Sequence, residues 1–400
     1  METDNGNSYK VVILGQEHHN ALNVARQLWL AGVKPYGIIN DSKRLFSSVI
    51  IHSRYWKKCV IVRDEKHGIK KAIELYGDLV NKPVLITCTD KYAACVDNNL
   101  NELKKYFVCP GVDEQGMLTK MMDKQWQHAF CKKNDINVVP SLEVNLLNYN
   151  KTIIDNLLRQ ENVEKSYIVK PLVSALGDKS DIRICENDDE LHSALCDFKE
   201  KNYDKVIVQH VLEYDYEMLL VGACFNNCPR NKFILLKTIR SYPVGRGTGC
   251  YRRFVVEKQV NEQADSIMSK LRKTGYRGLV DIEFFYKDGR LYLNEFNLRS
   301  SGSSFVGNKQ LFLYAYDYVR DAIGEKIEVA HPYEIPNLVS YTMTEYSDVR
   351  FPLYHGYSWK RWLKELRNVD DYSYYHWEDP LPMFLFYLKV FLYILFKRQW

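Results

Sequence analysis

The 400-residue sequence lacks the simple signals of a membrane, secreted or nucleic-acid-binding protein. Its N-terminus, METDNGNSYK, has no apolar core, so no signal peptide is expected. Its ten cysteines are scattered without a CxxC pair, which favours free thiols in a reducing cytoplasm over disulfides or a zinc site. The net charge of +5 is mild and there is no basic repeat or zinc-finger pattern, so no nucleic-acid partner is expected.

The composition that is present is that of a globular protein, with 46% hydrophobic and 26% charged residues. A chain of this length can form two or three packed domains. We divide it into an N-terminal domain (1–110), a central domain (111–330) and an aromatic-rich C-terminal extension (331–400). The small positive charge is compatible with an anionic substrate or a membrane surface.

The first segment alternates short apolar strands with helical stretches. Strands are expected at YKVVILG, YGIIN, CVIVR and PVLITCTD, which predicts a parallel sheet with crossover helices. The turn Gly15-Gln16-Glu17-His18 is not GxGxxG, and Glu17 would face a pyrophosphate with the wrong sign, so a dinucleotide fold is excluded. A turn that binds a small molecule and a purely structural turn both remain open.

The central segment begins with a predicted helix over 113–136. It continues with strands at SYIVKP, DIRICEN and KVIVQHVLEYDYEMLLVGACF, the last bent at 213–215, and with FILLKTIRSYP. The stretch VGRGTGCYRR, with three glycines and several arginines, is expected to be a flexible basic loop. The segment then reaches a hairpin, VDIEFFYKDGRLYLNEFN.

The hairpin ends in an unusual set of polar residues. Glu295, Asn297 and Arg299 follow an apolar strand at every second position, so they share one face. A two-residue turn puts Glu283 and Glu295 on opposite faces, whereas an odd loop or a bulge gathers the acids, and we predict the odd loop. Carboxylate and amide oxygens on one surface indicate Mg²⁺ (or Mn²⁺), completed by phosphate oxygens. A solvated strand face is the alternative.

Other polar residues in apolar surroundings suggest a nucleotide site. Lys170 ends an apolar strand, where an ammonium group suits phosphate, and Lys124 in the preceding helix is a weaker candidate. Gln209 and Leu212 lie at a strand edge whose backbone groups can hold an adenine ring, with Glu217 positioned for ribose hydroxyls. An ordinary strand end remains the alternative for each segment taken alone.

Taken in order, these features resemble the ATP-grasp ligases over roughly 113–305. The hallmark is an acidic residue, a hairpin and E-x-N-x-R, read here as Glu283 and then Glu295 to Arg299, and a separation of twelve positions suits the biotin-carboxylase-like branch. D-aspartate-ligase-like and carbamoyl-phosphate-synthase-like members look nearest. The implied fold class is α/β and α+β, with a parallel pre-ATP-grasp domain, a two-lobed ATP-grasp domain and a helical C-terminal extension.

The resemblance implies a role for each candidate residue. The implied ATP contacts are Lys124, Lys170, Gln209, Leu212 and Glu217, and the implied metal ligands are Glu283, Glu295 and Asn297. Arg299, together with Lys170, resembles the residues that steady the transferred phosphate. Arg240 and Arg246 are predicted to recognise the carboxylate substrate. The stretch PLVSALGDKS departs from the family's glycine-rich flap, because it has only Gly177, and Ser174 or Lys179 take over part of the flap's role.

The implied activity is ADP-forming ligation of a small-molecule carboxylate to an amine through an acyl phosphate. The acid is expected to be an amino acid and the amine part of a cell-surface polymer or lipid-linked precursor. Two alternatives stay open: an ATP-dependent carboxylase or kinase with the same fold, and a non-catalytic nucleotide-binding scaffold.

The chain closes on sixteen residues, Leu381 to Phe396, that are apolar or aromatic except Lys389. This stretch is shorter than the roughly 20 residues that span a bilayer, and the Lys397, Arg398 and Trp400 that follow suit a membrane interface. We expect residues 377–400 to contact the cytoplasmic face of a membrane. A helix buried against the protein's own core or in a homodimer contact is one alternative, and a true membrane span is another.

Overall fold

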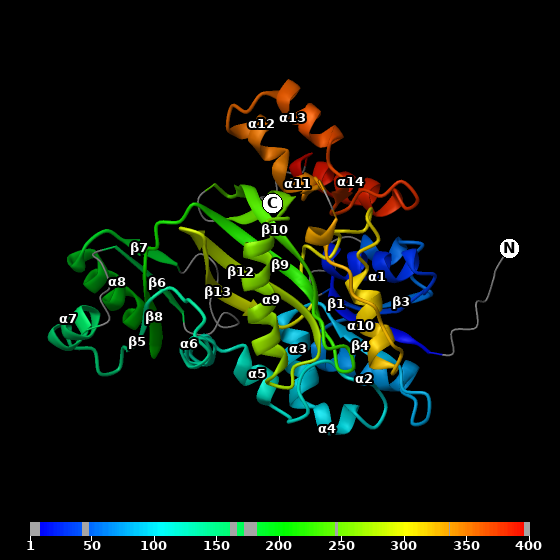
Figure 1. Cartoon of the computed structure of the whole chain (residues 1–400), viewed down its shortest axis with the longest axis horizontal. Helices are drawn as coiled ribbons and strands as arrows, with labels where there is room; N and C mark the ends of the chain where they lie inside the picture. Colours follow the sequence, from blue (N-terminus) through cyan, green and yellow to red (C-terminus); the bar gives the residue numbers. More distant parts are fainter. Residues whose placement is uncertain are drawn as a thin grey trace. The chain divides into compact units, whose positions relative to one another are not determined.

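The computed structural model of the chain describes residues 9–41, 48–160, 166–171, 182–244, 247–335 and 337–395 (Figure 1). It forms two compact units. The first unit comprises Met1–Thr119, Met218–Ile282 and Asn297–Trp400, and the second comprises Lys120–Glu217 and Glu283–Phe296. Strands β9, β12 and β13 contribute residues to both units.

The N-terminal part of the first unit is the predicted parallel α/β sheet, with strand order β3-β2-β1-β4. Its strands are β1 (Val11–Gln16), β2 (Tyr36–Asn40), β3 (Lys58–Val62) and β4 (Val84–Thr87). Between and after them lie α1 (His19–Leu30), η1 (Ile50–His52), α2 (Glu65–Tyr76), α3 (Asp90–Asn98) and α4 (Leu100–Leu103). Five consecutive residues of β1 are buried, as expected for a strand covered on both faces.

The first unit also holds most of a seven-stranded sheet with order β13-β12-β9-β10-β11-β14-β15. Its strands are β9 (Tyr216–Cys224), β10 (Lys232–Tyr242), β11 (Thr248–Phe254), β12 (Gly278–Lys287), β13 (Arg290–Asn297), β14 (Tyr341–Met343) and β15 (Asp371–Tyr372), and helix α9 (Lys258–Arg272) joins β11 to β12. The predicted basic loop over 244–253 is therefore wrong for its second half. Residues Thr248 to Phe254 form strand β11, which pairs with β10, and Cys250 and Tyr251 within it are buried.

The predicted odd hairpin loop is also wrong. Strands β12 and β13 are joined by two residues, Asp288 and Gly289, whose φ angles of 48° and 79° are both positive. Two positive φ angles are typical of the tight turn that matches the twist of the flanking strands. The burial alternation of β13 instead breaks further on, at Asn294 and Glu295, which are both half-buried. Both Glu283 and Glu295 nevertheless act on the charge of Lys170, so the two carboxylates lie near the same ammonium group.

The C-terminal extension belongs to the core of the first unit. It contains η3 (Pro332–Glu334), α11 (Glu345–Asp348), α12 (Arg350–Tyr354), α13 (Trp359–Arg367) and α14 (Leu381–Leu395), and it follows α10 (Tyr314–Ala322). The helices α11 to α14 are coloured orange to red in Figure 1. Arg26 of α1 donates hydrogen bonds to the carbonyls of Tyr372 (2.9 Å) and Tyr374 (3.1 Å), and Ser53 donates to Asp379 (2.6 Å). The extension is thus bonded to the N-terminal sheet domain.

Helix α14 has two apolar sides with different environments. Met383, Leu385, Phe386 and Val390 pack against the core of the first unit, whereas Phe384 and Phe391 are 62% and 57% exposed. Burial of one side is the alternative that the sequence left open. Across the described residues, no helix is both long and apolar enough to cross a membrane.

The second unit is a four-stranded sheet covered by helices, with strand order β5-β8-β6-β7. Its strands are β5 (Ser141–Asn145), β6 (Tyr167–Pro171), β7 (Arg183–Cys185) and β8 (Lys205–His210), and its helices are α6 (Lys124–Lys133), α7 (Lys151–Gln160) and α8 (Asp188–Glu200). The single helix predicted over 113–136 is two helices, α5 (Met117–Met121) and α6. Asp123 separates them, because its carboxylate caps α6 by accepting from the amides of Gln125 (2.8 Å) and Trp126 (3.1 Å).

Candidate active site

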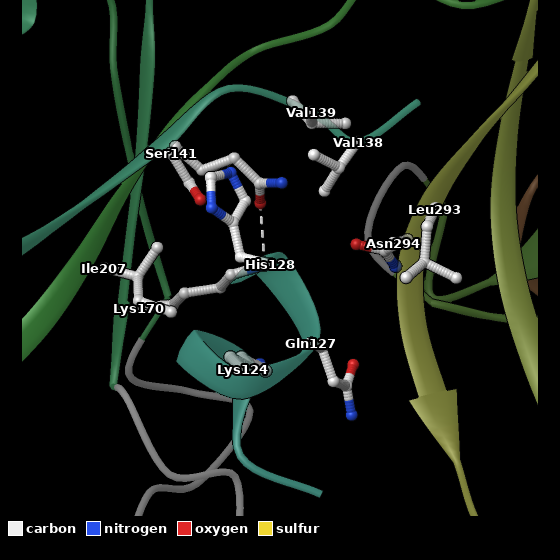
Figure 2. Close-up of a pocket in the computed structure, with 11 residues that line it drawn as sticks. Lys124, Gln127, His128, Val138, Val139, Ser141, Lys170, Ile207, Leu293 and Asn294 are labelled. Atoms are coloured by element: carbon white, nitrogen blue, oxygen red, sulfur yellow. Dashed lines mark hydrogen bonds between the residues drawn. The ribbon is translucent and has the colours of Figure 1, made fainter. Parts of the chain in front are cut away.

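A small cavity in the second unit gathers several of the predicted nucleotide residues (Figure 2). Its volume is about 30 Å³. Lys124 and His128 reach it from α6, Lys170 from β6, Ser141 from β5, and Asn294 from β13. The side chains therefore lie close around a small space that is partly open to solvent.

Lys170 is the central charge of this cavity. Its ammonium group donates a hydrogen bond to Oε1 of Gln209 over 2.7 Å, drawn as the dashed line in Figure 2. Burial, with the nearby charge of Lys124, lowers the pKa of Lys170 to about 8, while Glu295 and Glu283 oppose this shift. The four charged side chains are therefore electrostatically coupled, although they are far apart in the sequence.

Helix α6 is held on strand β13 by one buried amide. Gln127 donates from Nε2 to the carbonyl of Phe296 (2.9 Å) and accepts at Oε1 from the amide of Phe296 (2.9 Å). This pair of hydrogen bonds fixes the first turn of α6 beside the end of β13. Lys124 consequently lies with its ammonium nitrogen 3.9 Å from Oε1 of Glu295.

Glu283 has a side-chain partner that was not predicted to be part of the site. Its Oε2 accepts a hydrogen bond from Nδ2 of Asn294 over 3.1 Å. This is the pair that a two-residue turn places opposite one another. Asn294 could have been found from the sequence by assuming the Asp288-Gly289 turn, which is the strongest short hairpin signal in the chain.

The predicted residues Asn297 and Arg299 form a separate polar cluster in the first unit. Nδ2 of Asn297 donates to Oδ1 of the buried Asp281 (3.1 Å), and Oδ1 of Asn297 accepts from Nη2 of Arg299 (3.1 Å). Arg299 also binds Asp90, the first residue of α3, through two hydrogen bonds. Burial raises the pKa of Asp281, and the charge of Arg299 opposes the rise. Asp90 carries no sequence signal, because its partner lies 209 positions away.

Of the two arginines predicted to bind the carboxylate substrate, Arg240 and Arg246, the structure describes only Arg240. The donors of Arg240 bind Asp348 (2.9 and 2.7 Å), Glu365 (2.7 Å) and the hydroxyl of Tyr357 (3.1 Å). Its side chain is only 10% exposed, so this group is a structural ion-pair centre that ties β10 to the C-terminal extension. Arg246 lies outside the described residues, as do Gly177, Ser174 and Lys179 of the predicted flap.

On the basic strand β11 the structure offers another arginine. Arg252 is buried, and its Nη1 donates to Oγ of Ser303 over 3.1 Å. Its positive charge also acts on Asp281. Among the arginines of this stretch, Arg252 rather than Arg240 is close to the polar cluster that contains Asn297 and Arg299.

The remaining nucleotide candidates lie on the connection from β8 to β9. Gln209 is buried and accepts from Lys170, while Leu212 is half-buried on the segment that follows β8. Glu217, half-buried on β9, accepts from the hydroxyl of Tyr214 over 3.2 Å. Within this connection the amide of Val211 donates to the carbonyl of Ser166 (2.9 Å) and the amide of Asp215 donates to the carbonyl of Tyr286 (2.9 Å).

The donor chemistry of the predicted metal ligands fits a hard divalent cation. Glu283, Glu295 and Asn297 offer carboxylate and amide oxygens only, which is the set that Mg²⁺ prefers. Among the described residues, no three His, Cys, Asp or Glu side chains converge closely enough to hold a metal by themselves. Phosphate oxygens would therefore have to supply the further ligands of the cation. The ammonium group of Lys124, which lies beside Glu295, is a suitable partner for such a phosphate.

Fold and site together define an α/β protein in which a parallel-sheet domain is followed along the chain by a site that lysine and glutamate side chains line. Residues 130–307 match the family described as the ATP-grasp domain. This match covers 178 of the 400 residues. D-aspartate ligase of Enterococcus faecium (strain Aus0004) is 26% identical over 250 residues, which cover 59% of this chain and 58% of that enzyme. The chain thus matches little more than half the length of this relative.

Two solved structures illustrate the shared fold. N5-carboxyaminoimidazole synthetase from Staphylococcus aureus superposes with a TM-score of 0.59 at 16% identity, covering 80% of this chain and 79% of that chain. The biotin carboxylase domain of Hydrogenobacter thermophilus 2-oxoglutarate carboxylase, solved with MgADP and bicarbonate, has a TM-score of 0.61 at 15% identity, covering 82% and 73%. At these identities the likeness concerns the fold.

Proposed function

We propose that the protein is an ATP-dependent carboxylate–amine ligase that forms ADP and works through an acyl phosphate. The observation that carries this proposal is the coupled set of Lys124, Lys170, Glu283 and Glu295. Two ammonium groups beside two carboxylates suit a Mg²⁺-bound triphosphate, since the lysines bind phosphate oxygens and the carboxylates bind the cation.

In the second unit, we assign Lys124 and Lys170 to the phosphates of ATP. Gln209 and Leu212 contact the adenine ring, and Glu217 contacts the ribose hydroxyls. Phosphate binding competes with the hydrogen bond from Lys170 to Gln209. The resulting loss of this bond frees the amide of Gln209 for the base.

Glu283, Glu295 and Asn297 are assigned as ligands of the divalent cation, Mg²⁺ or Mn²⁺. The cation, when bound, neutralises charge on the transferred phosphoryl group. Arg299 places a guanidinium on the same strand end, where it stabilises the oxygens of that group. Asp90 orients Arg299, because two hydrogen bonds to one carboxylate fix the plane of the guanidinium.

The reaction follows from these roles. A carboxylate oxygen attacks the γ-phosphorus, the bond to the β–γ bridging oxygen breaks, and ADP leaves. An uncharged amine then attacks the carbonyl carbon of the acyl phosphate, inorganic phosphate leaves, and the amine nitrogen loses a proton. Positioning and charge neutralisation supply most of the rate enhancement in such a transfer.

For the substrates, the similarity to D-aspartate ligase supports an amino acid as the acid and an amine on a cell-surface polymer or lipid-linked precursor as the acceptor. The outward side of α14 supports a peripheral membrane contact near such an acceptor, since Leu381, Phe384, Leu388 and Phe391 are exposed along it. A vesicle-flotation assay of a Phe384→Ser, Phe391→Ser double variant tests this contact, and unchanged flotation removes its basis.

The activity is tested by trapping the acyl phosphate with hydroxylamine. The protein is incubated with Mg²⁺, ATP, hydroxylamine and a pool of carboxylic acids, and hydroxamates are identified by mass spectrometry. We expect a hydroxamate that is lost in Glu295→Gln and retained in Glu143→Gln, a control on β5 that pairs with Lys205. A phosphorylated or carboxylated product without hydroxamate would identify the carboxylase or kinase alternative. ATP binding without any turnover would identify the scaffold.

A further inference from the structure

A second and much larger cavity lies in the first unit, where the C-terminal extension meets the N-terminal sheet domain. Its volume is about 320 Å³, which is in the range of small-molecule sites. The turn after β1 contributes Glu17 and His18, and the extension contributes aromatic rings and two cations. This is the turn for which the sequence left small-molecule binding open.

The aromatic wall of the cavity is rigid. Tyr374 and Phe386 stack with their ring centroids 4.3 Å apart, and Tyr346 packs against Phe386 at 5.1 Å. The backbone of Tyr374 is fixed by a hydrogen bond from its amide to Glu345 (2.8 Å). Three packed rings give a preformed apolar surface that suits the body of an organic ligand.

The cavity also presents two half-buried cations, Arg350 and Lys389. Within the part of the chain that the structure describes, neither has a hydrogen-bond or ion-pair partner, and the guanidinium of Arg350 lies 4.9 Å from the ring centroid of Tyr242. Among the described residues that line the cavity, Glu17 is the only one with a carboxylate. Its Oε1 accepts from the amide of Val49 over 2.6 Å, and Ser48 donates to its Oε2.

The charge balance of the cavity therefore favours an anion. Two cations face one carboxylate, and that carboxylate is already compensated by the donors of the loop at 48–50. Burial raises the pKa of Glu17, whereas its hydrogen bonds to Ser48 and Val49 and the nearby charge of Lys389 oppose the rise. An anionic group bound here would gain a guanidinium and an ammonium partner in partly desolvated surroundings.

One end of the cavity is close to the strand end that carries Arg299. Burial lowers the pKa of His18, and the positive charge of Arg299 lowers it further. A side chain added at Gly302, three residues after Arg299, would meet Oδ1 of Asn20 at 3.2 Å and Cε1 of His18 at 3.8 Å. Because residue 302 is glycine, the turn after β1 and the segment after β13 can lie this close together.

We propose that this cavity binds one substrate of the ligase, an organic compound with a ring-containing or branched apolar body and an anionic group that does not react. The non-reacting anion pairs with Arg350 and Lys389, the body packs on Tyr346, Tyr374 and Phe386, and the reacting end extends past His18 toward Arg299. A carboxylate held by two cations is a poor nucleophile, so the group that reacts is the other end. This assignment rests on the proposed ligase activity.

The first test needs no turnover and uses anilinonaphthalene sulfonate, a fluorescent aromatic anion. We expect one binding site per chain, with affinity reduced about tenfold in Arg350→Gln and in Lys389→Gln and largely restored in Arg350→Lys. Two controls should bind the probe as the parent protein does. Lys364→Gln removes a cation of α13 outside the cavity, and Phe384→Ser changes the outward side of α14.

The outcomes separate this proposal from the proposed activity. The cavity assignment would be overturned if Arg350→Gln and Lys389→Gln bound the probe as tightly as the parent protein, at equal thermal midpoints. It would also be overturned if only Phe384→Ser lost binding of the probe. If a hydroxamate is found, Arg350→Gln should raise the KM of its acid or amine about tenfold with kcat unchanged. Probe binding that depends on Arg350, without any hydroxamate, would reject the ligase and leave an anion site.

Discussion

The guanidinium of Arg299 and the carboxylate of Asp90 form a two-point contact, with Nε to Oδ1 at 3.0 Å and Nη2 to Oδ2 at 3.2 Å. Arg299 follows strand β13, and Asp90 begins helix α3 directly after the parallel sheet strand β4. The N-terminal sheet domain thus has a direct part in orienting a residue of the E-x-N-x-R sequence. Asp90 is a positioning residue, since it acts through Arg299.

Replacing Asp90 with Asn should lower kcat by about tenfold or more, because one of two charge-assisted hydrogen bonds to Arg299 is weakened and the opposing charge is lost. The Kd of ATP, measured by calorimetry, should change less than about twofold, since the nucleotide residues of the second unit are untouched. Asp64→Asn is the matched control, because Asp64 caps α2 of the same domain and Asn caps equally well. Equal loss of kcat in both variants would contradict the role of Asp90.

Replacing Gln127 with Leu should weaken ATP binding without removing any group that touches the nucleotide. Both hydrogen bonds to Phe296 are lost, so α6 and Lys124 are no longer held beside Glu295. We expect the Kd of ATP to rise about tenfold, measured by calorimetry with the thermal midpoint recorded in parallel. In the control Gln125→Leu, on the same helix, the Kd should be unchanged, because the exposed side chain of Gln125 makes no hydrogen bond with the described residues.

ATP affinity should fall with rising pH because of Lys170. Its pKa is lowered to about 8, so the ammonium form that binds phosphate is lost as the pH rises through that value. From pH 7 to pH 9 the fraction of charged Lys170 in the free protein falls about tenfold, and the Kd should rise by up to that factor. In Lys170→Arg the guanidinium stays charged, so the Kd should be flat over the same range. An equally steep rise in that variant would assign the pH dependence to another group.

Arg240→Ala should destabilise the protein. The side chains of Asp348 and Glu365 are 0% and 19% exposed, and both lose their cationic partner. We expect the free energy of unfolding in urea to fall by about 3 kcal/mol. Arg253→Ala on the neighbouring strand β11 removes an exposed pair with Glu257 at 3.8 Å and should change this free energy by less than about 0.5 kcal/mol. A raised substrate KM with unchanged stability would instead support the substrate role first expected for Arg240.

The sequence by itself determined the elements and the residue types of the site. Apolar runs such as VVILG at β1 predicted buried parallel strands, and the order of Lys170, Glu283, Glu295 and Asn297 indicated the ATP-grasp domain. These signals are local, because burial of a strand and the chemistry of a ligand depend on a few neighbouring residues. The dipeptide Asp288-Gly289 is also a local signal, and it indicates the two-residue turn that the structure has. An odd loop was predicted instead because it would bring the acidic side chains to one face of the hairpin.

Only the tertiary structure decided which charges meet. Arg299 pairs with Asp90 across 209 positions, and Arg240 pairs with Asp348 and Glu365 across 108 and 125 positions. No periodicity in the sequence separates an arginine that faces an internal acid from one that faces a ligand, since both occupy similar strand positions. The cavity beside His18 likewise depends on α14 folding back over the N-terminal domain. Long-range packing, rather than local propensity, therefore sets the partner of each charge.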